Sequence, residues 1–156
     1  MLPFFLFWMS CVEEESIEAE SLYGSWKNSI YSEFLDLDRV EVYYFDNTGK
    51  YIKYTGFNVA GGSNFLGYTM YLEGNYVLSG KQILLKEEKR LVHLGEEAYD
   101  QLEGLSEVAK IDEIPASLAF KDDRSVLEIT TTCSPLLSSI CIPVTTYTRL
   151  KTIVHF

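Results

Sequence analysis

Few side chains of this 156-residue chain have the type and spacing that chemistry requires. The only two histidines, His93 and His155, lie far apart in the sequence, so the pattern indicates neither a catalytic triad nor a histidine metal site. The segment Asp46-Asn47-Thr48-Gly49 resembles the start of a calcium loop but lacks the later bidentate glutamate, and a hairpin turn accounts for it fully. We therefore predict no metal site and no cofactor, and we expect both histidines on the surface.

Two pairs of nearby carboxylates, Asp36 with Asp38 and Asp122 with Asp123, are the remaining candidates for acid–base catalysis. Acid–base work needs a carboxyl group with a raised pKa, whereas adjacent acids in turn-like sequence are usually both solvated. The glycine-rich segment 61–64 lacks the Gly-Lys-Ser/Thr ending that would cradle a phosphate. We therefore predict that the protein is not an enzyme.

Two cysteines near the C-terminus, Cys133 and Cys141, are separated by seven residues and flanked by strand-like sequence. This spacing is wider than the two to four residues of common zinc sites, and no histidine lies nearby. Outside the cytoplasm such a pair is oxidised. We favour a disulfide bond, with two free thiols in the core as the alternative.

The first eleven residues are apolar and uncharged up to Ser10 and Cys11, which precede the acidic run Glu13-Glu14-Glu15. This ending resembles a bacterial lipoprotein signal, in which a small residue precedes the cleavage site and the next residue supplies the thiol for the lipid. The run is too short to span a bilayer, which takes about 20 apolar residues. We expect residues 1–10 to be a signal peptide and Cys11 to carry the lipid. The alternative is an apolar first strand or a buried N-terminal plug.

The formal net charge of −10 argues against nucleic acid as a partner, because such binding needs a basic surface. Residues 11–20 carry many like charges and little to bury, so we expect an acidic tether. The membrane is then a partner through the acyl anchor. The acidic run is similar to signals that send some lipoproteins to the cell face, which implies the cell envelope, the outer membrane and surface exposure.

The rest of the chain reads as one all-β domain over residues 21–150, followed by a tail over 151–156. Aromatic residues make up 14% of the chain, and such a composition favours strands. Short apolar segments separated by glycine-containing turns predict an antiparallel meander. These expected strands are 22–30, 40–45, 51–55, 65–73, 74–78, 82–86, 117–120, 126–133 and 141–150. Apolar residues at three- and four-residue spacings in 90–110 predict one short helix inside a long connection.

Three motifs in this order resemble the lipocalin-like domains of bacterial (Bacteroides-like) envelope lipoproteins. They are the opening Leu22-Tyr23-Gly24-Ser25-Trp26-Lys27, the hairpin 74–85 with its Gly-x-Tyr start, and the ending Thr146-Tyr147-Thr148-Arg149-Leu150. The resemblance implies an up-and-down barrel of about eight strands, whose interior just holds side chains or one small ligand. It also implies that Trp26 plugs the closed end of the barrel with Arg149 stacked on its ring.

Two functions are compatible with this architecture. The first is a lipid-anchored envelope protein that binds a small apolar ligand among inward aromatic residues, for which we select Tyr44, Tyr54, Tyr68 and Tyr76 as candidates. The second is an interaction module with a filled barrel, which docks another envelope protein or a host protein through exposed tyrosines and an acidic surface. An empty cavity of roughly a few hundred cubic ångströms would favour the first.

Overall fold

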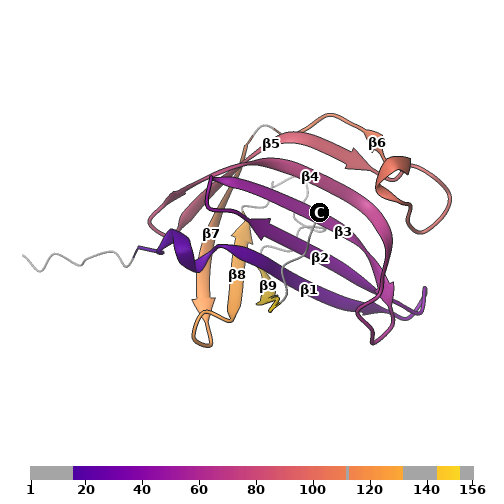
Figure 1. Cartoon of the computed structure of the whole chain (residues 1–156), viewed down its shortest axis with the longest axis horizontal. Helices are drawn as coiled ribbons and strands as arrows, with labels where there is room; N and C mark the ends of the chain where they lie inside the picture. The colour runs from indigo at the N-terminus through magenta and orange to yellow at the C-terminus, as the bar shows by residue number, and fades with distance from the viewer. Residues whose placement is uncertain (1–15, 112, 132–143, 152–156) are drawn as a thin grey trace, which may run out of the picture.

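The computed structural model describes residues 16–111, 113–131 and 144–151, and these form an antiparallel all-β structure (Figure 1). Two short 3-10 helices, η1 (Ala19–Ser21) and η2 (Leu102–Gly104), accompany the strands. The strands are β1 (Gly24–Ser32), β2 (Leu37–Phe45), β3 (Lys50–Val59), β4 (Phe65–Ser79), β5 (Gln82–Val92), β6 (Ser106–Glu107), β7 (Ile114–Lys121), β8 (Val126–Thr131) and β9 (Val144–Arg149). None of the described helices has the length and apolar character needed to cross a membrane.

The sheet closes on itself into a ring. Its strand order is β4-β3-β2-β1-β9-β8-β7-β5-β6, and β4 also pairs with β5, which joins the two sides of the sheet. Each of the eight ring strands therefore pairs with its neighbours in chain order. The short β6 pairs with the C-terminal end of β5, at Leu91 and Val92. The prediction of an antiparallel all-β fold is confirmed. The pairing of β1 with β9 brings the two ends of the meander together.

Two of the hairpin turns follow directly from glycines at positions where the backbone is left-handed. Gly49, between β2 and β3, has φ of 84°, and Gly80, between β4 and β5, has φ of 60°. Only glycine adopts such angles without steric cost. The Asp46 side chain completes the first turn, because it accepts hydrogen bonds from the backbone N–H of Thr48 at 2.8 Å and of Lys50 at 2.9 Å. The hairpin turn predicted at residues 46–50 is confirmed.

The helix predicted over residues 90–110 is wrong. β5 continues to Val92, and the connection after it contains only the three-residue η2 and the two-residue β6. The edge of β4 explains this result, because Tyr68 exchanges backbone hydrogen bonds of 2.7 and 3.0 Å with Asp100. The backbone N–H and C=O groups at the edge of a strand need hydrogen-bond partners. An α-helix could not supply them, because its own backbone groups are already paired within the helix. Leu94, one of the apolar residues whose spacing predicts that helix, is 70% exposed.

Two further boundaries differ from the sequence-based assignment. Residues 65–79 form one strand rather than two, because the chain passes Gly74 with a register shift instead of a turn. The last part of the expected tether also belongs to the fold: the backbone N–H of Ile17 donates to the Gly80 carbonyl at 3.2 Å, and the Ile17 side chain packs on the core. Among the described residues, the chain is thus bound to the ring from Ile17 onward.

The larger hydrophobic cluster fills one part of the ring interior. Every strand of the eight-stranded ring contributes at least one side chain to it, which places it inside rather than on one outer face. Its largest fully buried members are Trp26, Tyr51 and Phe45. The ring centroids of Phe45 and Tyr51 are 6.3 Å apart, and the rings of Phe45 and Tyr76 meet edge to face at 5.3 Å between centroids. We call this packed region the closed half of the ring.

A smaller cluster lies on the outer face of the sheet. It comprises Val42, Tyr54 and Tyr71, with Ile52, Tyr68, Leu91, Leu102 and Leu105 packed against it. Its strand members come only from β2 to β5, and side chains alternate between the faces of a strand, so Val42 points away from its buried neighbour Tyr43. Leu102 and Leu105 come from the long connection after β5. That connection therefore covers the outer face of the sheet.

Candidate functional site

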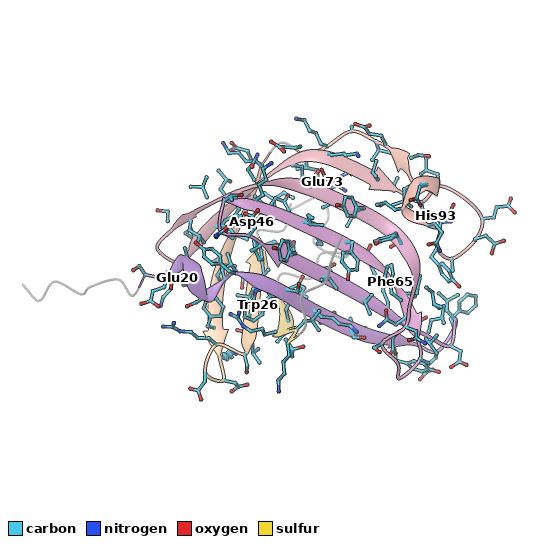
Figure 2. The ribbon with its side chains drawn as sticks, in the orientation of Figure 1. Glu20, Trp26, Asp46, Phe65, Glu73 and His93 are labelled. Atoms are coloured by element: carbon cyan, nitrogen blue, oxygen red, sulfur yellow. The ribbon has the colours of Figure 1, made fainter. Side chains whose placement is uncertain are left out.

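The end of the ring that carries Trp26 is closed by the residues around η1. Trp26 is fully buried, and its indole N–H donates to the Leu22 carbonyl at 2.8 Å. Trp26 pairs with Arg149 across β1 and β9, and the guanidinium carbon of Arg149 lies 4.3 Å from the centroid of the Trp26 ring. The structure thus brings together the two residues that the sequence assigned to closure. In Figure 2, Trp26 lies toward the end of the ring that carries Glu20, and Phe65 lies toward the opposite end.

Arg149 does more than stack on the indole ring. Its guanidinium donates to the carbonyl of Tyr23 at 2.9 Å, to that of Ser21, and to that of Arg124 at 3.3 Å. Burial lowers the pKa of Arg149, but an arginine stays charged across the physiological range. One cation therefore joins the last strand, the β7–β8 turn and the segment that precedes β1. These contacts make the closed end a structural plug rather than a ligand site.

The other half of the interior holds a cavity of about 450 Å³. The inward positions of β1 after Trp26 are Asn28 and Ile30, so the cavity follows the packed cluster along the same strands. Its lining residues are Asn28, Ile30, Arg39, Glu41, Tyr43, Lys53, Ile129, Thr131, Thr145 and Tyr147. Only the two isoleucines in this set are purely apolar. We call this region the open half of the ring.

An ion pair lies at the inner side of the cavity. The Lys53 ammonium nitrogen is 3.3 Å from Oε1 of Glu41 and 4.8 Å from the centroid of the Tyr43 ring. The Tyr147 hydroxyl donates a hydrogen bond to the same Glu41 oxygen. Burial by itself lowers the pKa of Lys53, but the interactions with Tyr43 and Glu41 outweigh burial, and the net result is a raised pKa. Lys53 therefore carries its charge at neutral pH.

The tyrosines beside this ion pair stay neutral. Burial is the main reason why the pKa values of Tyr43 and Tyr147 are raised, and the Glu41 carboxylate raises both further. Their hydroxyl groups are therefore hydrogen-bond donors at physiological pH. The inner wall of the cavity thus combines a satisfied ion pair with neutral hydroxyl groups.

A second ion pair is buried more completely. Glu87 has a side chain with 0% exposure and accepts from Arg90 Nε at 2.9 Å and from the backbone N–H of Ile111 at 2.8 Å. Glu87 lies two residues after Leu85, a member of the interior cluster, and it faces the same side of β5. Its partners are all protein groups, so this pair stabilises the junction of β5 with the connection before β7. It does not line the cavity.

The four tyrosines selected as ligand candidates do not form one site. Tyr76 belongs to the packed interior cluster, where its hydroxyl donates to the Asp46 carbonyl at 2.6 Å. Tyr54 and Tyr68 belong to the outer cluster, with ring centroids 5.5 Å apart, and Tyr44 lies beside a shallow surface pocket of about 160 Å³. The assignment of Tyr44, Tyr54 and Tyr68 to the interior is wrong, because apolar residues occupy both faces of these strands and the pattern did not reveal which face turns inward.

The cavity residues were missed for a related reason. Arg39, Glu41 and Tyr43 occupy alternate positions of β2, all on the inward face. Charged residues that alternate with apolar ones are typical of a solvated face, so the sequence pattern did not single out Arg39 and Glu41. The available signal was the buried Phe45 two residues later on the same face.

Other residues weighed in the sequence have local roles or lie outside the description. Asp36 accepts from the Tyr31 hydroxyl at 2.7 Å, and a ring nitrogen of His93 lies 2.8 Å from the Glu97 carbonyl oxygen. Within the described residues, no three His, Cys, Asp or Glu side chains gather as a metal site would require. Four residues singled out earlier lie outside the described residues, namely Cys11, Cys133, Cys141 and His155.

A hollow of about 410 Å³ also lies outside the ring at the closed end, between residues 16–21 and the β7–β8 turn. Its cations already have partners. Arg124 is 3.0 Å from Glu18, and Lys121 is 2.6 Å from Glu128. The Arg124–Glu18 contact holds the N-terminal segment against the ring, so we take the hollow as structural.

Comparisons with known proteins leave the site to be interpreted from its own geometry. No family model, curated protein or solved structure matches this chain.

Proposed function

We propose that this chain is a lipid-anchored protein of the bacterial cell envelope whose ring is a lipocalin-like barrel that binds a small molecule in its open half. The observation that carries the proposal is the cavity of about 450 Å³ inside the ring, a size within the usual range for small-molecule sites. The protein acts as a binding protein and not as an enzyme.

The plugged end supports the lipocalin-like assignment. The contact of Arg149 with Trp26 at 4.3 Å is the closing contact that the resemblance implied. A plug at one end and a cavity at the other give the interior one accessible side. A small molecule would then enter past Arg39 and Ile30, away from η1.

The lining supports a ligand with polar groups rather than the purely apolar ligand expected from the sequence. A buried polar group left without a partner costs about 1 to 3 kcal/mol, so an apolar molecule would be penalised where it covers Arg39 and Thr131. Polar ligand groups would instead replace the water that these side chains lose.

The proposed anchor would hold the protein in the envelope. Cys11 is the proposed lipidated residue, and it lies six positions before Ile17, which is fixed to the closed end through Gly80. A chain of that length reaches at most about 20 Å. The closed end would thus lie near the outer membrane and the open half away from it. Partition of wild-type protein into detergent on phase separation, lost in Cys11→Ala, tests the anchor, and protease treatment of intact cells tests surface exposure.

Native mass spectrometry of the full chain in detergent tests ligand binding. We expect a co-purifying small molecule, and we expect Thr145→Phe to abolish it because the new ring would fill the cavity. Thr146→Phe is the matched control, since Thr146 is the next residue on β9 and is exposed on the opposite face. If wild type carries no molecule, or if both variants retain it equally, cavity binding is disproved.

A second candidate function, docking of another envelope or host protein, is favoured by the β1–β2 hairpin. Phe34 is 95% exposed there and Tyr31 is 52% exposed, and an exposed apolar group of this kind is typical of a partner site. Tyr31 is the one tyrosine of the chain in the exposed class, so docking would depend on this hairpin rather than on many tyrosines. Loss of cross-linking to a partner in cells by Phe34→Ser, but not by Thr145→Phe, tests it.

A further inference from the structure

We infer that the ligand of the open half is a small hydroxylated organic anion, held by Arg39 at the cavity wall with Lys53 behind it. This inference rests on the proposed function, because it assumes that the cavity binds a small molecule. It specifies the charge and the chemical class of that molecule.

The charges on the cavity wall favour an anion. Three charged side chains line it, namely Arg39, Glu41 and Lys53, so the wall carries a net charge of +1 in a protein with a net charge of −10. Glu41 is already satisfied by Lys53 at 3.3 Å and by the Tyr147 hydroxyl. Arg39 is exposed at the mouth of the cavity and has no carboxylate partner within the described residues. A ligand carboxylate would provide that partner.

A cationic ligand would fit this wall poorly. It would have to compete with Lys53 for Glu41 while facing the Arg39 guanidinium across the same space. The negative charge on the outer surface does not reverse this preference, because salt screens charges beyond about 8 Å at physiological ionic strength. The cations on the cavity wall therefore determine which ligand charge the cavity favours.

The neutral polar groups indicate hydroxyl groups on the ligand. Thr131 and Thr145 contribute hydroxyl groups from β8 and β9, and Thr145 lies opposite Ile129 in the strand pair. A threonine hydroxyl can both donate and accept, as a ligand hydroxyl can. The rings are less available for stacking, because Lys53 lies over Tyr43 and Phe45 stacks on it at 5.5 Å.

Three probes of similar size distinguish whether the cavity prefers an anionic, a neutral or a cationic ligand. Isothermal titration of the full chain in detergent with gluconate, glucitol and protonated glucosamine compares an anion, a neutral molecule and a cation. We expect gluconate to bind about tenfold more tightly than glucitol, which is the usual net effect of one charge-assisted hydrogen-bonded contact. Glucosamine should bind most weakly.

Three variants assign the effect to the cavity wall. Arg39→Gln should weaken gluconate binding about tenfold and leave glucitol binding unchanged. Lys27→Gln is the matched control, because it removes a positive charge from the outward position next to Asn28 and should change the affinity less than about twofold. Glu41→Gln should tighten gluconate binding about threefold, because it removes a competing negative charge.

The outcomes distinguish this inference from the proposed function. Equal or tighter binding of glucitol or glucosamine, an unchanged affinity in Arg39→Gln, or no binding of any probe would overturn the anion assignment. A co-purified molecule that mass spectrometry identifies as neutral or cationic, and that Thr145→Phe removes, would overturn it while the proposed function stands. The absence of any co-purified molecule from wild type would instead remove the proposed function.

Discussion

The closed and open halves of the ring are made from the same strands but have opposite interiors. On β1, the inward residue is Trp26 in the closed half and Asn28 in the open half. On β2, Phe45 is followed toward the open half by Tyr43, Glu41 and Arg39. A buried polar group costs free energy unless it is paired, so the closed half stabilises the fold, whereas the open half keeps the polar groups that the proposed binding would use. If the open half binds a small molecule as proposed, one ring separates stability from function along its axis.

The largest expected effect is at the plug. Trp26→Ala should reduce the free energy of unfolding by about 3 to 5 kcal/mol, because it leaves a cavity where a fully buried indole packed. Urea denaturation measures the change. Arg149→Ala should cost much less once Trp26 is replaced, because the two side chains are in contact and their effects are not additive. Strictly additive losses in the double variant would show that the two residues act independently.

The ion pairs Glu87–Arg90 and Glu41–Lys53 test whether the open half contributes less to stability than the rest of the interior, because each pair joins one glutamate to one cation. Arg90 and Lys53 are equally exposed at 18%, but the side chain of Glu87 is 0% exposed and that of Glu41 is 24% exposed. Glu87→Gln should destabilise by about 3 kcal/mol, because it breaks an ion pair whose carboxylate is fully buried. Glu41→Gln should cost no more than about 1 kcal/mol. Equal losses in urea denaturation would mean that the open half also serves stability.

The cysteine pair lies between β8 and β9, outside the described residues. If Cys133 and Cys141 are joined, the bridge should stabilise by about 2 to 4 kcal/mol, largely by restricting the unfolded chain. Mass mapping of a non-reduced digest should show one linked peptide. Two free thiols there would exclude the bridge, and the stability of the ring would then rest on packing alone.

The smallest expected effect is at the turn after β2. Asp46→Ala should destabilise by about 1 kcal/mol at pH 7, because two backbone N–H groups lose their acceptor. Burial alone would raise the pKa of Asp46, but hydrogen bonds from Lys50 and Thr48 outweigh it and lower the pKa below its usual value. The stabilisation is therefore complete above the ordinary carboxyl pKa and is lost as the pH falls through the lowered value. Denaturation at pH 7 and pH 3 should show the difference between variant and wild type shrinking.

The sequence by itself determined the strand-rich architecture and its turns. Aromatic and β-branched segments between turn residues predicted the antiparallel meander, and Gly49 with Asp46 predicted a specific hairpin. The pairing of Trp26 with Arg149 followed from a resemblance between motifs at the two ends of the chain. These features depend on local backbone preferences or on short motifs, so they can be read without knowledge of the fold.

Only the tertiary structure decided which face of each strand turns inward and which residues form the cavity. On β2, both Tyr43 and Tyr44 are aromatic, and both Val42 and Phe45 are buried, so alternation alone could not distinguish the two faces. The connection after β5 covers the outer face with Leu102 and Leu105, which makes that face apolar as well and also produced the false helix pattern. Ring closure through the β4–β5 pairing then placed Arg39, Glu41 and Lys53 around one space. The physical reason is that burial depends on which distant segment covers a side chain, and this is a property of the assembled ring rather than of the local sequence.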